Sequence, residues 1–370
     1  MKKSPLLLLS AVLACLSLFG CSEQKKEEAP QQKKQEGQAE AQKEGQAKKT
    51  DAQQTLYIYN WTYYIPDQVV KDFEKEYNAK VVYDMYASNE EMFTKLKAGG
   101  SGYDLVFPSG DYVSIMIKEN MLEQIDRAKV PNFKNLDPAV LAKIHFDEGS
   151  KYSVPYMMGA AGVAVNKKHV PNFDKSWSLF NREDLKGRMT MLDDMREVLG
   201  AALKSLGYSV NTKNLDELEK AKELVKQWKT KIVKFDAESF GKGFAAGEFW
   251  VVQGYQENIF LELDESARKD VEFFIPKEGS AMYMDNMVLL KNAKNKELAY
   301  TFMNYIHEPK VYAQIVDFLM LPSINVPARD IRTVKPNYEI ADLDRSEFKE
   351  DLGESLNEYN QVWQKIIVGE

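Results

Sequence analysis

Apolar and polar positions alternate in a regular order over much of the chain, and this order predicts both strands and helices. Residues 56–60 alternate β-branched and aromatic side chains, which is typical of a strand. A cluster of aromatic residues follows and ends at Pro66, which can take the first position of a helix over 67–77. Further strands are expected over 80–86 and 103–107, each followed by apolar residues at helical spacing. This order predicts an α/β fold with a mostly parallel sheet and right-handed crossovers.

A second group of elements follows the first, and we find no internal repeat between them. The expected elements are an extended segment over 154–166, helices over 197–206 and 214–229, an apolar strand over 284–290, a helix over 296–306, a segment over 309–319 and a last amphipathic helix over about 352–367. The chain after residue 54 has 316 residues, which is enough for two lobes rather than one core.

The first twenty residues have the pattern of a secretory signal rather than of a folded element. Met1-Lys2-Lys3 precedes an apolar run over 5–19, which is too short to span a bilayer comfortably. The run ends Leu18-Phe19-Gly20-Cys21, which resembles a bacterial lipoprotein cleavage box and implies acylation of Cys21. The alternative is an ordinary thiol after a cleaved signal. Cys15 lies inside the signal, so the mature chain is expected to have no disulfide and no cysteine metal site.

Residues 21–54 are predicted to form a disordered tether that follows the signal. The segment is dominated by Lys, Glu, Gln, Ala and Gly, and it has no aromatic or β-branched aliphatic residue that could be buried. Its charges balance, so removing them together with Lys2 and Lys3 changes the net charge from −7 to −9 for residues 55–370. An acidic folded part argues against a nucleic-acid partner and favours cationic partners.

Motifs of the common catalytic and metal sites are absent from the sequence. The three histidines, His145, His169 and His307, stand far apart and in no ligand-spaced motif. There is no nucleophile elbow, zinc helix or phosphate loop. We therefore expect no metal and no cofactor.

Candidate binding residues follow the predicted strands of the first part. Trp61, Thr62 and Tyr64 stand between a strand and a helix, at the carboxyl end of the strand, where open α/β sheets bind small ligands. The alternative is that the two aromatic residues cap the core. Ser109 and Asp111 follow the next buried strand in the same way, although Asp111 can equally be an N-cap.

Further carboxylates stand at comparable positions in the second part. Asp194 and Glu197 follow a probable strand over 188–192 and share a face in the first turn of a helix. Helix capping and dipole stabilisation are the alternative explanation for this pair. Asp285 stands at the start of an apolar strand, where it could also be a turn residue.

Short motifs in chain order from about Leu56 to Glu370 resemble the spermidine/putrescine-binding proteins of bacterial polyamine ABC importers. These motifs are Tyr59-Asn60-Trp61-Thr62, Ser88-Asn89-Glu90, Tyr103-Asp104-Leu105-Val106 with Pro108-Ser109, Asn135-Leu136-Asp137-Pro138, Asp193-Asp194 with Arg196-Glu197-Val198, and Pro276-Lys277-Glu278-Gly279 with Met284-Asp285. The resemblance implies a two-lobed periplasmic-binding-protein fold of type II, with a mostly parallel sheet and flanking helices in each lobe and a ligand cleft between the lobes. Lobe 1 would comprise 55–158 and about 286–325, and lobe 2 would comprise 159–285 and about 326–370.

The resemblance also assigns ligand-contacting roles to individual residues. The matching positions are Trp61, Thr62, Tyr64, Ser109, Asp194, Glu197 and Asp285, with Tyr255 and Tyr283 in place of two family tryptophans. Tyr255 and Tyr283 keep an aromatic face, but three other positions depart more seriously from the family pattern. Asp111 stands where a tyrosine is common in spermidine binders, Leu321 replaces a tyrosine, and Lys349 replaces a glutamine.

This residue set suits a polyamine, which is a row of ammonium groups separated by methylenes. Carboxylates would pair with the charges, hydroxyls would accept spare N–H groups, and aromatic rings would line the alkyl stretches. The sequence therefore predicts a receptor that captures polyamines and delivers them to a membrane permease. We expect a monomer with no catalytic residues, not an enzyme, on the periplasmic or cell-surface side of a bacterial membrane and attached by its lipid.

The ATP hydrolysis that drives import is expected in separate ATPase subunits, because the chain has no phosphate loop. Three other functions stay open. The same fold could bind another organic cation or a metal complex. A secreted carboxylate enzyme such as a glycosidase could use Asp194 and Glu197, although its two carboxylates must flank the scissile bond. A surface adhesin with a vestigial site would bind no small ligand.

Overall fold

The computed structural model describes residues 53–100 and 102–369. The predicted signal peptide, the acylation site at Cys21 and nearly all of the tether lie outside the described residues. All described residues belong to one compact unit of the chain, residues 51–370. Within the described ranges, no helix combines the length and the apolar character that a bilayer crossing requires.

The first sheet has six strands, in the order β10-β9-β3-β1-β2 with β4 added on β9. The three strands of the predicted alternation, β1 to β3, are parallel to one another, while β9 runs antiparallel to both β3 and β4. The strands of this sheet are β1 (Gln54–Trp61), β2 (Ala79–Tyr86), β3 (Leu105–Val106), β4 (Ser153–Ala160), β9 (Ala281–Leu289) and β10 (Glu347–Phe348).

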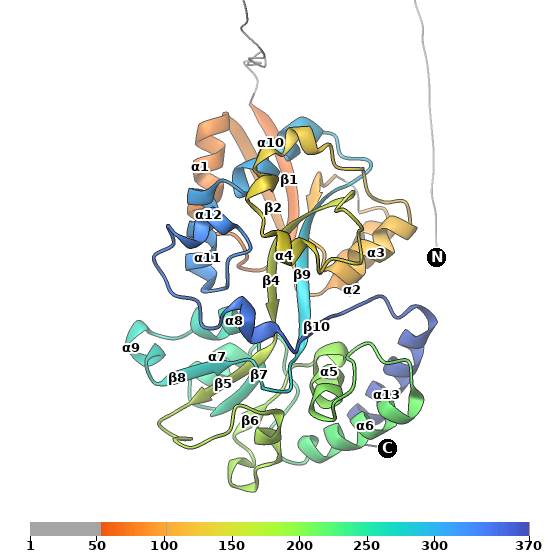
Figure 1. The fold of residues 1–370 in the computed structure, drawn as a ribbon, viewed down its shortest axis with the longest axis vertical. Helices are drawn as coiled ribbons and strands as arrows, with labels where there is room; N and C mark the ends of the chain where they lie inside the picture. The colour runs from red at the N-terminus through yellow and green to blue at the C-terminus, as the bar shows by residue number, and fades with distance from the viewer. Residues whose placement is uncertain (1–52, 101, 370) are drawn as a thin grey trace, which may run out of the picture. The chain divides into compact units, whose positions relative to one another are not determined.

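Helices cover both faces of the first sheet, with α1 and α11 on one side and α2 and α3 on the other (Figure 1). The pleat of β1 explains why both faces are covered, because Ile58 packs with the core on the α1 side and Tyr59 packs with the core on the α2 side. The helices of this part are α1 (Asp67–Tyr77), α2 (Asn89–Lys97), α3 (Gly110–Lys118), α4 (Pro138–Leu141), α10 (Lys296–Ile306), α11 (Pro309–Leu319) and α12 (Val326–Arg329).

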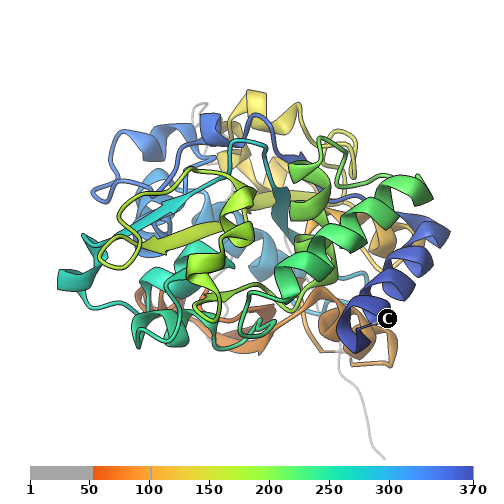
Figure 2. The same ribbon diagram turned by 90° about the horizontal axis from the view of Figure 1, so that it is seen from below.

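The second sheet has four strands in the order β6-β7-β5-β8. Its strands are β5 (Gly162–Asn166), β6 (Met189–Thr190), β7 (Val251–Gly254) and β8 (Val271–Phe274), and its helices are α5 (Met195–Ser205), α6 (Leu215–Lys229), α7 (Phe240–Ala245), α8 (Gln256–Phe260), α9 (Glu265–Arg268) and α13 (Leu356–Val368). Helices α5, α6 and α13 pack side by side, as Figure 2 shows at the lower right. Short 3-10 turns occupy Arg127–Lys129, Pro131–Asn135, Trp177–Asn181, Glu183–Leu185, Ile340–Leu343 and Gly353–Ser355.

The expected two-lobed α/β architecture is confirmed, but the prediction of a mostly parallel second sheet is wrong. Only β6 and β7 are parallel there, and β5 runs antiparallel to β7 and to β8. The crossover through α5 and α6 makes the one parallel pair. Strand β5 instead continues from β4 after the single residue Ala161, so it enters from the first sheet and runs opposite to its neighbours.

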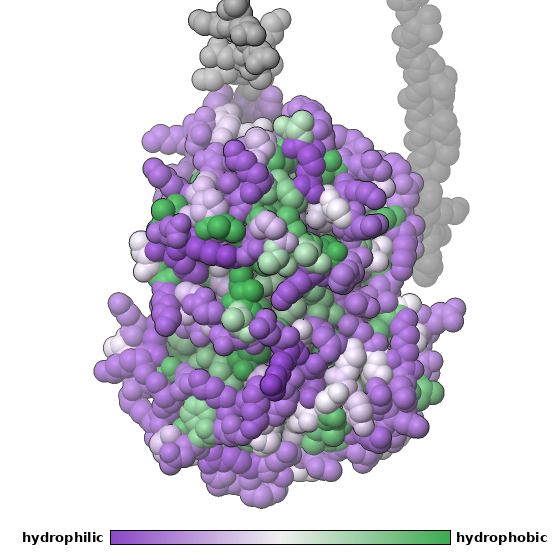
Figure 3. All heavy atoms as spheres, in the orientation of Figure 1, coloured by the Kyte–Doolittle hydropathy of each residue, from purple (hydrophilic) through white to green (hydrophobic). Residues whose placement is uncertain are grey.

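The chain passes between the two sheets more than once. The predicted extended segment over 154–166 is in fact two strands, β4 in the first sheet and β5 in the second. Strand β9 covers the predicted apolar strand over 284–290 apart from its last residue. The largest hydrophobic cluster accordingly joins residues of both lobes, such as Phe73 and Phe244. The predicted residue boundaries of the lobes stay predictions. Most of the face drawn in Figure 3 is hydrophilic, and hydrophobic residues show in smaller areas.

Candidate ligand-binding site

Asp285 lies in the middle of β9 and is the centre of the first part of the site. Its backbone forms an isolated antiparallel bridge with Ser109. Ser109 Oγ donates to one carboxylate oxygen at 2.6 Å, and the Tyr64 hydroxyl donates to the other at 2.7 Å. Only 4% of the residue is exposed. Burial raises the pKa of Asp285 to about 7, against the opposite effect of the two hydroxyl groups.

Tyr64 and Ser109 lie on the segments that follow β1 and β3, and side chains from α2 and β4 hold these two residues in place. Asn89 binds Ser109 twice, since its side-chain amide donates to Ser109 Oγ at 3.1 Å and its oxygen accepts from the Ser109 backbone N–H at 3.2 Å. The Tyr156 hydroxyl donates to the Tyr64 carbonyl at 2.6 Å. Tyr64 and Ser109 therefore meet Asp285 because the carboxyl ends of neighbouring strands share one edge of the sheet.

Trp61 is the last residue of β1 and Thr62 is the first residue after it, and the two have different surroundings. The indole N–H of Trp61 donates to the Phe107 carbonyl at 2.8 Å, and its ring lies 4.7 Å from the Tyr86 ring. Trp61 is half-buried, which leaves part of its ring accessible, while Thr62 is exposed. Trp61 thus has the packing contacts of a core cap as well as a surface that a ligand could reach.

Asp194 and Glu197 stand at the start of α5, but Asp194 caps the helix whereas Glu197 binds buried side chains. One carboxylate oxygen of Asp194 accepts from the backbone N–H groups of Arg196 at 2.9 Å and Glu197 at 3.0 Å, so Asp194 is the N-cap of the helix. Glu197 points into the protein and is 1% exposed. Its Oε1 accepts from Lys349 Nζ at 2.6 Å and from the Tyr255 hydroxyl at 3.1 Å, and its Oε2 has no hydrogen-bond partner among the described residues.

Lys349 follows β10, and the sequence singled it out only as a departure from a family glutamine, not as the partner of Glu197. Its backbone N–H donates to the Met282 carbonyl at 3.1 Å, which fixes it beside β9. Burial lowers the pKa of its ammonium, but the carboxylates of Glu197, Asp194 and Asp111 raise it by more than that. The net pKa is therefore raised, and the group stays charged. Burial in turn raises the pKa of Glu197, and Lys349 opposes this increase.

Tyr255 and Tyr283 lie between two groups of carboxylates, with Glu197 on one side and Asp285 and Glu257 on the other. Their ring centroids are 5.7 Å apart with the planes at 76°. The Tyr283 hydroxyl lies 3.5 Å from Oε1 of Glu257, on α8. Burial raises the pKa of Glu257 to about 7, and its Oε2 has no partner in the described part of the chain. Glu257 was not predicted, although it follows strand β7 closely, just as Thr62 and Tyr64 follow β1.

The remaining departures from the family pattern differ in their placement. Helix α3 has Ser109 as its N-cap, so the alternative role of Asp111 as the N-cap is wrong. Asp111 lies in the first turn with one carboxylate oxygen buried and without a partner among the described residues. Burial raises the pKa of Asp111, while Lys349 and Arg196 lower it. Leu321 is fully buried and packs in the hydrophobic core.

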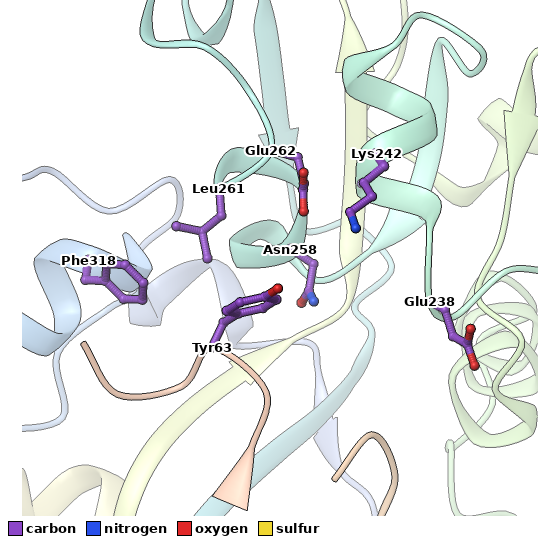
Figure 4. Close-up of a pocket in the computed structure, with 8 residues that line it drawn as sticks. Tyr63, Glu238, Lys242, Asn258, Leu261, Glu262 and Phe318 are labelled. Atoms are coloured by element: carbon purple, nitrogen blue, oxygen red, sulfur yellow. The ribbon is translucent and has the colours of Figure 1, made fainter. Parts of the chain in front are cut away.

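A separate cavity of about 330 Å³ opens beside the site. It is lined by Tyr63 and Phe318 from the first lobe, and the other labelled side chains, including Lys242 and Glu262, come from around α7 and α8 (Figure 4). None of the predicted binding residues lines it. We therefore place the candidate site at the buried carboxylates and tyrosines rather than in this cavity. In the described ranges, no group of histidine, cysteine and acidic residues could hold a metal ion.

Comparisons with known proteins agree on one family. The model of the bacterial extracellular solute-binding protein family matches residues 68–336. The spermidine/putrescine-binding periplasmic protein of Escherichia coli K12 is 36% identical over 329 residues, covering 86% of this chain and 93% of that protein. The putrescine-binding periplasmic protein SpuD of Pseudomonas aeruginosa is 34% identical over 291 residues, covering 74% of this chain and 79% of that protein.

Solved structures lead to the same group. The Tp0655 (TpPotD) lipoprotein of Treponema pallidum superposes with a TM-score of 0.82 at 48% identity, covering 84% of this chain and 99% of that one. A putative spermidine/putrescine ABC transporter protein from Listeria monocytogenes has a TM-score of 0.77 at 31% identity, covering 85% and 99%.

Proposed function

The chain belongs to the bacterial extracellular solute-binding proteins, in the family that includes the spermidine/putrescine-binding periplasmic proteins, and from this premise we propose that it is the polyamine receptor of an ABC importer. The receptor captures a polyamine between its two lobes and delivers it to a membrane permease. Its relatives are binding proteins of transporters rather than enzymes.

The state of Asp285 is the observation on which this proposal depends. The carboxylate is buried, and both of its oxygens accept hydrogen bonds from neutral hydroxyl groups. No lysine or arginine within residues 53–100 and 102–369 forms an ion pair with it. A buried carboxylate without a cation is costly, and an ammonium group from a ligand would supply the missing charge.

The surrounding rings suit the rest of a polyamine. Tyr255 and Tyr283 form a wall between Asp285 and Glu197, and Trp61 is half-buried at the end of β1, three residues before Tyr64. Methylene groups pack against such rings, and ammonium groups bind their faces through cation–π attraction. A sugar-cleaving enzyme is a weaker candidate, because Oδ1 of Asp194 already accepts from two backbone N–H groups at the start of α5.

The remaining parts of the proposal concern the partners and the location. We propose that the receptor is a monomer, that it works with an ABC permease and separate ATPase subunits, and that a lipid on Cys21 attaches it to a membrane on the periplasmic or cell-surface side. We also propose that lobes 1 and 2 have the residue boundaries given above, with the ligand cleft between them.

Calorimetry would test the proposed function directly. Full-length protein in detergent is titrated with putrescine, spermidine and spermine, and sugar polymers are incubated with it in parallel. We expect saturable binding of at least one polyamine and no sugar turnover. Absence of binding to all three polyamines would refute the proposal, and turnover of a sugar polymer would favour the enzyme instead.

A further inference from the structure

The buried carboxylates of the site form two groups on either side of the tyrosine pair. Asp285 and Glu257 make one group, which contains no basic side chain within bonding distance among the described residues. Glu197 makes the other group together with Asp194 and Asp111. The connection between the groups runs from Glu197 through the Tyr255 hydroxyl, across the two rings and on to the Tyr283 hydroxyl beside Glu257.

The second group already contains an ammonium from the protein itself. Lys349 Nζ lies 2.6 Å from Glu197 Oε1, and the two side chains are only 10% and 0% exposed. The segment that supplies Lys349 is held on both sides, because its backbone binds Met282 and the nearby Glu347 accepts from Lys204 at 2.7 Å. Lys349 is therefore a fixed part of the site rather than a surface lysine that happens to reach it.

We propose that Lys349 is a specificity-determining residue that occupies one of the ammonium positions of the site and so selects diamines over triamines. This inference rests on the proposed polyamine function. A ligand ammonium can bind at Asp285 and Glu257 without displacing any charge of the protein. A second ammonium can approach the unpartnered oxygen of Asp111. A third would have to compete with Lys349 for Glu197.

The energetics of buried charges support this selection. Displacing Lys349 from Glu197 would leave a buried ammonium without its partner, which costs far more than breaking a surface ion pair. A diamine avoids that cost, whereas a triamine bears it or leaves one of its own charges unpaired. The same reasoning distinguishes the proposal from a purely structural ion pair, whose loss would weaken the binding of every ligand alike.

The test compares the affinities for putrescine and spermidine in full-length protein in detergent. The variants are Lys349→Gln, which frees Glu197, and Lys349→Arg, which keeps the positive charge. The matched control is Lys222→Gln on α6, since Lys222 also pairs with a glutamate, Glu219, has a side chain that is 10% exposed, and lies outside the site. The melting temperature of each protein is measured alongside, so that a loss of stability is seen separately from a change in selection.

We expect the parent to bind putrescine at least as tightly as spermidine. In Lys349→Gln the preference should move toward spermidine by about tenfold or more, as expected for an additional unpaired carboxylate facing a ligand charge. Lys349→Arg and Lys222→Gln should keep the preference of the parent.

Several results would overturn the inference. One is a parent that binds spermidine more than about tenfold tighter than putrescine, which can be measured even if Lys349→Gln does not fold. Another is a Lys349→Gln protein that binds polyamines with the preference of the parent; this result would leave the proposed function intact. Absence of polyamine binding by the parent would overturn the proposed function together with the inference.

Discussion

Replacing Asp285 with asparagine should weaken ligand binding while making the ligand-free protein more stable. The substitution keeps the size of the side chain and removes its charge. Ligand binding depends on that charge, because the carboxylate is proposed to pair with an ammonium in a dry site. Folding does not depend on it, because no cation of the described protein is paired with it.

The magnitudes follow from the surroundings of the carboxylate. Losing one partner of a buried charged pair costs about 2–4 kcal/mol, so the Kd should rise by about 30- to 1,000-fold. In the free protein, burial raises the pKa of Asp285 from 3.8 to about 7. A shift of this size means that the ionised group destabilises the fold by roughly 4 kcal/mol above pH 8. Removing the charge should therefore stabilise the free protein. An amide cannot accept both hydroxyl hydrogen bonds, however, and the loss of one offsets about 1–2 kcal/mol of this stabilisation.

Asp104→Asn is the matched control for this prediction. Asp104 is also a buried aspartate of the first lobe, but its oxygens accept from the backbone N–H groups of Tyr57, Lys294 and Asn295 at 2.9–3.0 Å. Its carboxylate therefore joins two backbone segments of the fold and is not available to bind a ligand. Asp104→Asn should lower the free energy of unfolding by about 1–3 kcal/mol and leave the affinity nearly unchanged.

The assay combines calorimetric titration with thermal unfolding at pH 8.5. We expect Asp285→Asn to bind weakly and melt at a higher temperature than the parent, and Asp104→Asn to do the reverse. An Asp285→Asn protein that binds every polyamine like the parent would show that the site has been assigned to the wrong residues. One that melts well below the parent would show that the charge has a structural role.

Further predictions concern pH, the aromatic wall and the anchor. Ligand affinity should be highest above pH 7 and fall as the pH drops through about 7, since the carboxyls of Asp285 and Glu257 have pKa values raised to about 7 and must ionise to bind an ammonium; titrations in buffers of different ionisation heat should record the released protons. The same two groups should stabilise the ligand-free fold progressively as the pH falls from 8 to 5, which is the opposite sign and is measurable by thermal unfolding. Trp61→Leu should weaken polyamine binding by about 1–2 kcal/mol in calorimetry, because an apolar wall remains but the π face is lost. Cys21→Ala should release the protein into the aqueous phase of a detergent partition, because a lipid is the proposed attachment.

Residues that depend on one strand and its following loop could be predicted from the sequence. Trp61 and Ser109 are recognisable because each stands at or just after the carboxyl end of an apolar strand, and the parallel order of β1 and β3 brings them to one edge. Asp285 was predicted at the start of an apolar strand, but it lies in the middle of β9. The pattern of apolar residues could not show that the segment over 154–166 divides at Ala161 between two sheets, since both halves are equally buried. The antiparallel direction of β5 in the second sheet could not be predicted either, because it follows from that division.

Contacts between distant segments could not be predicted. The pair of Glu197 and Lys349 joins residues 152 positions apart and exists because the short strand β10 pairs with β9. The local pattern around Lys349 does not indicate this ion pair, and only the match to a family glutamine marked the position. Glu257 was overlooked for a different reason, because the strand before it has only four residues and its helix only five.

The strand order of the first sheet has a consequence for how the protein is made. Strand β9 lies between β10 and β3 and also pairs with β4. These strands therefore cannot join into one sheet until residue 289 has left the ribosome. At about 5–20 residues per second, translation from the end of β3 to the end of β9 takes about ten to forty seconds. During that interval β3 is paired only on its β1 side, and β4, once it has been made, has no partner strand. Chaperones therefore have tens of seconds in which to engage a chain that is still unable to complete its first lobe.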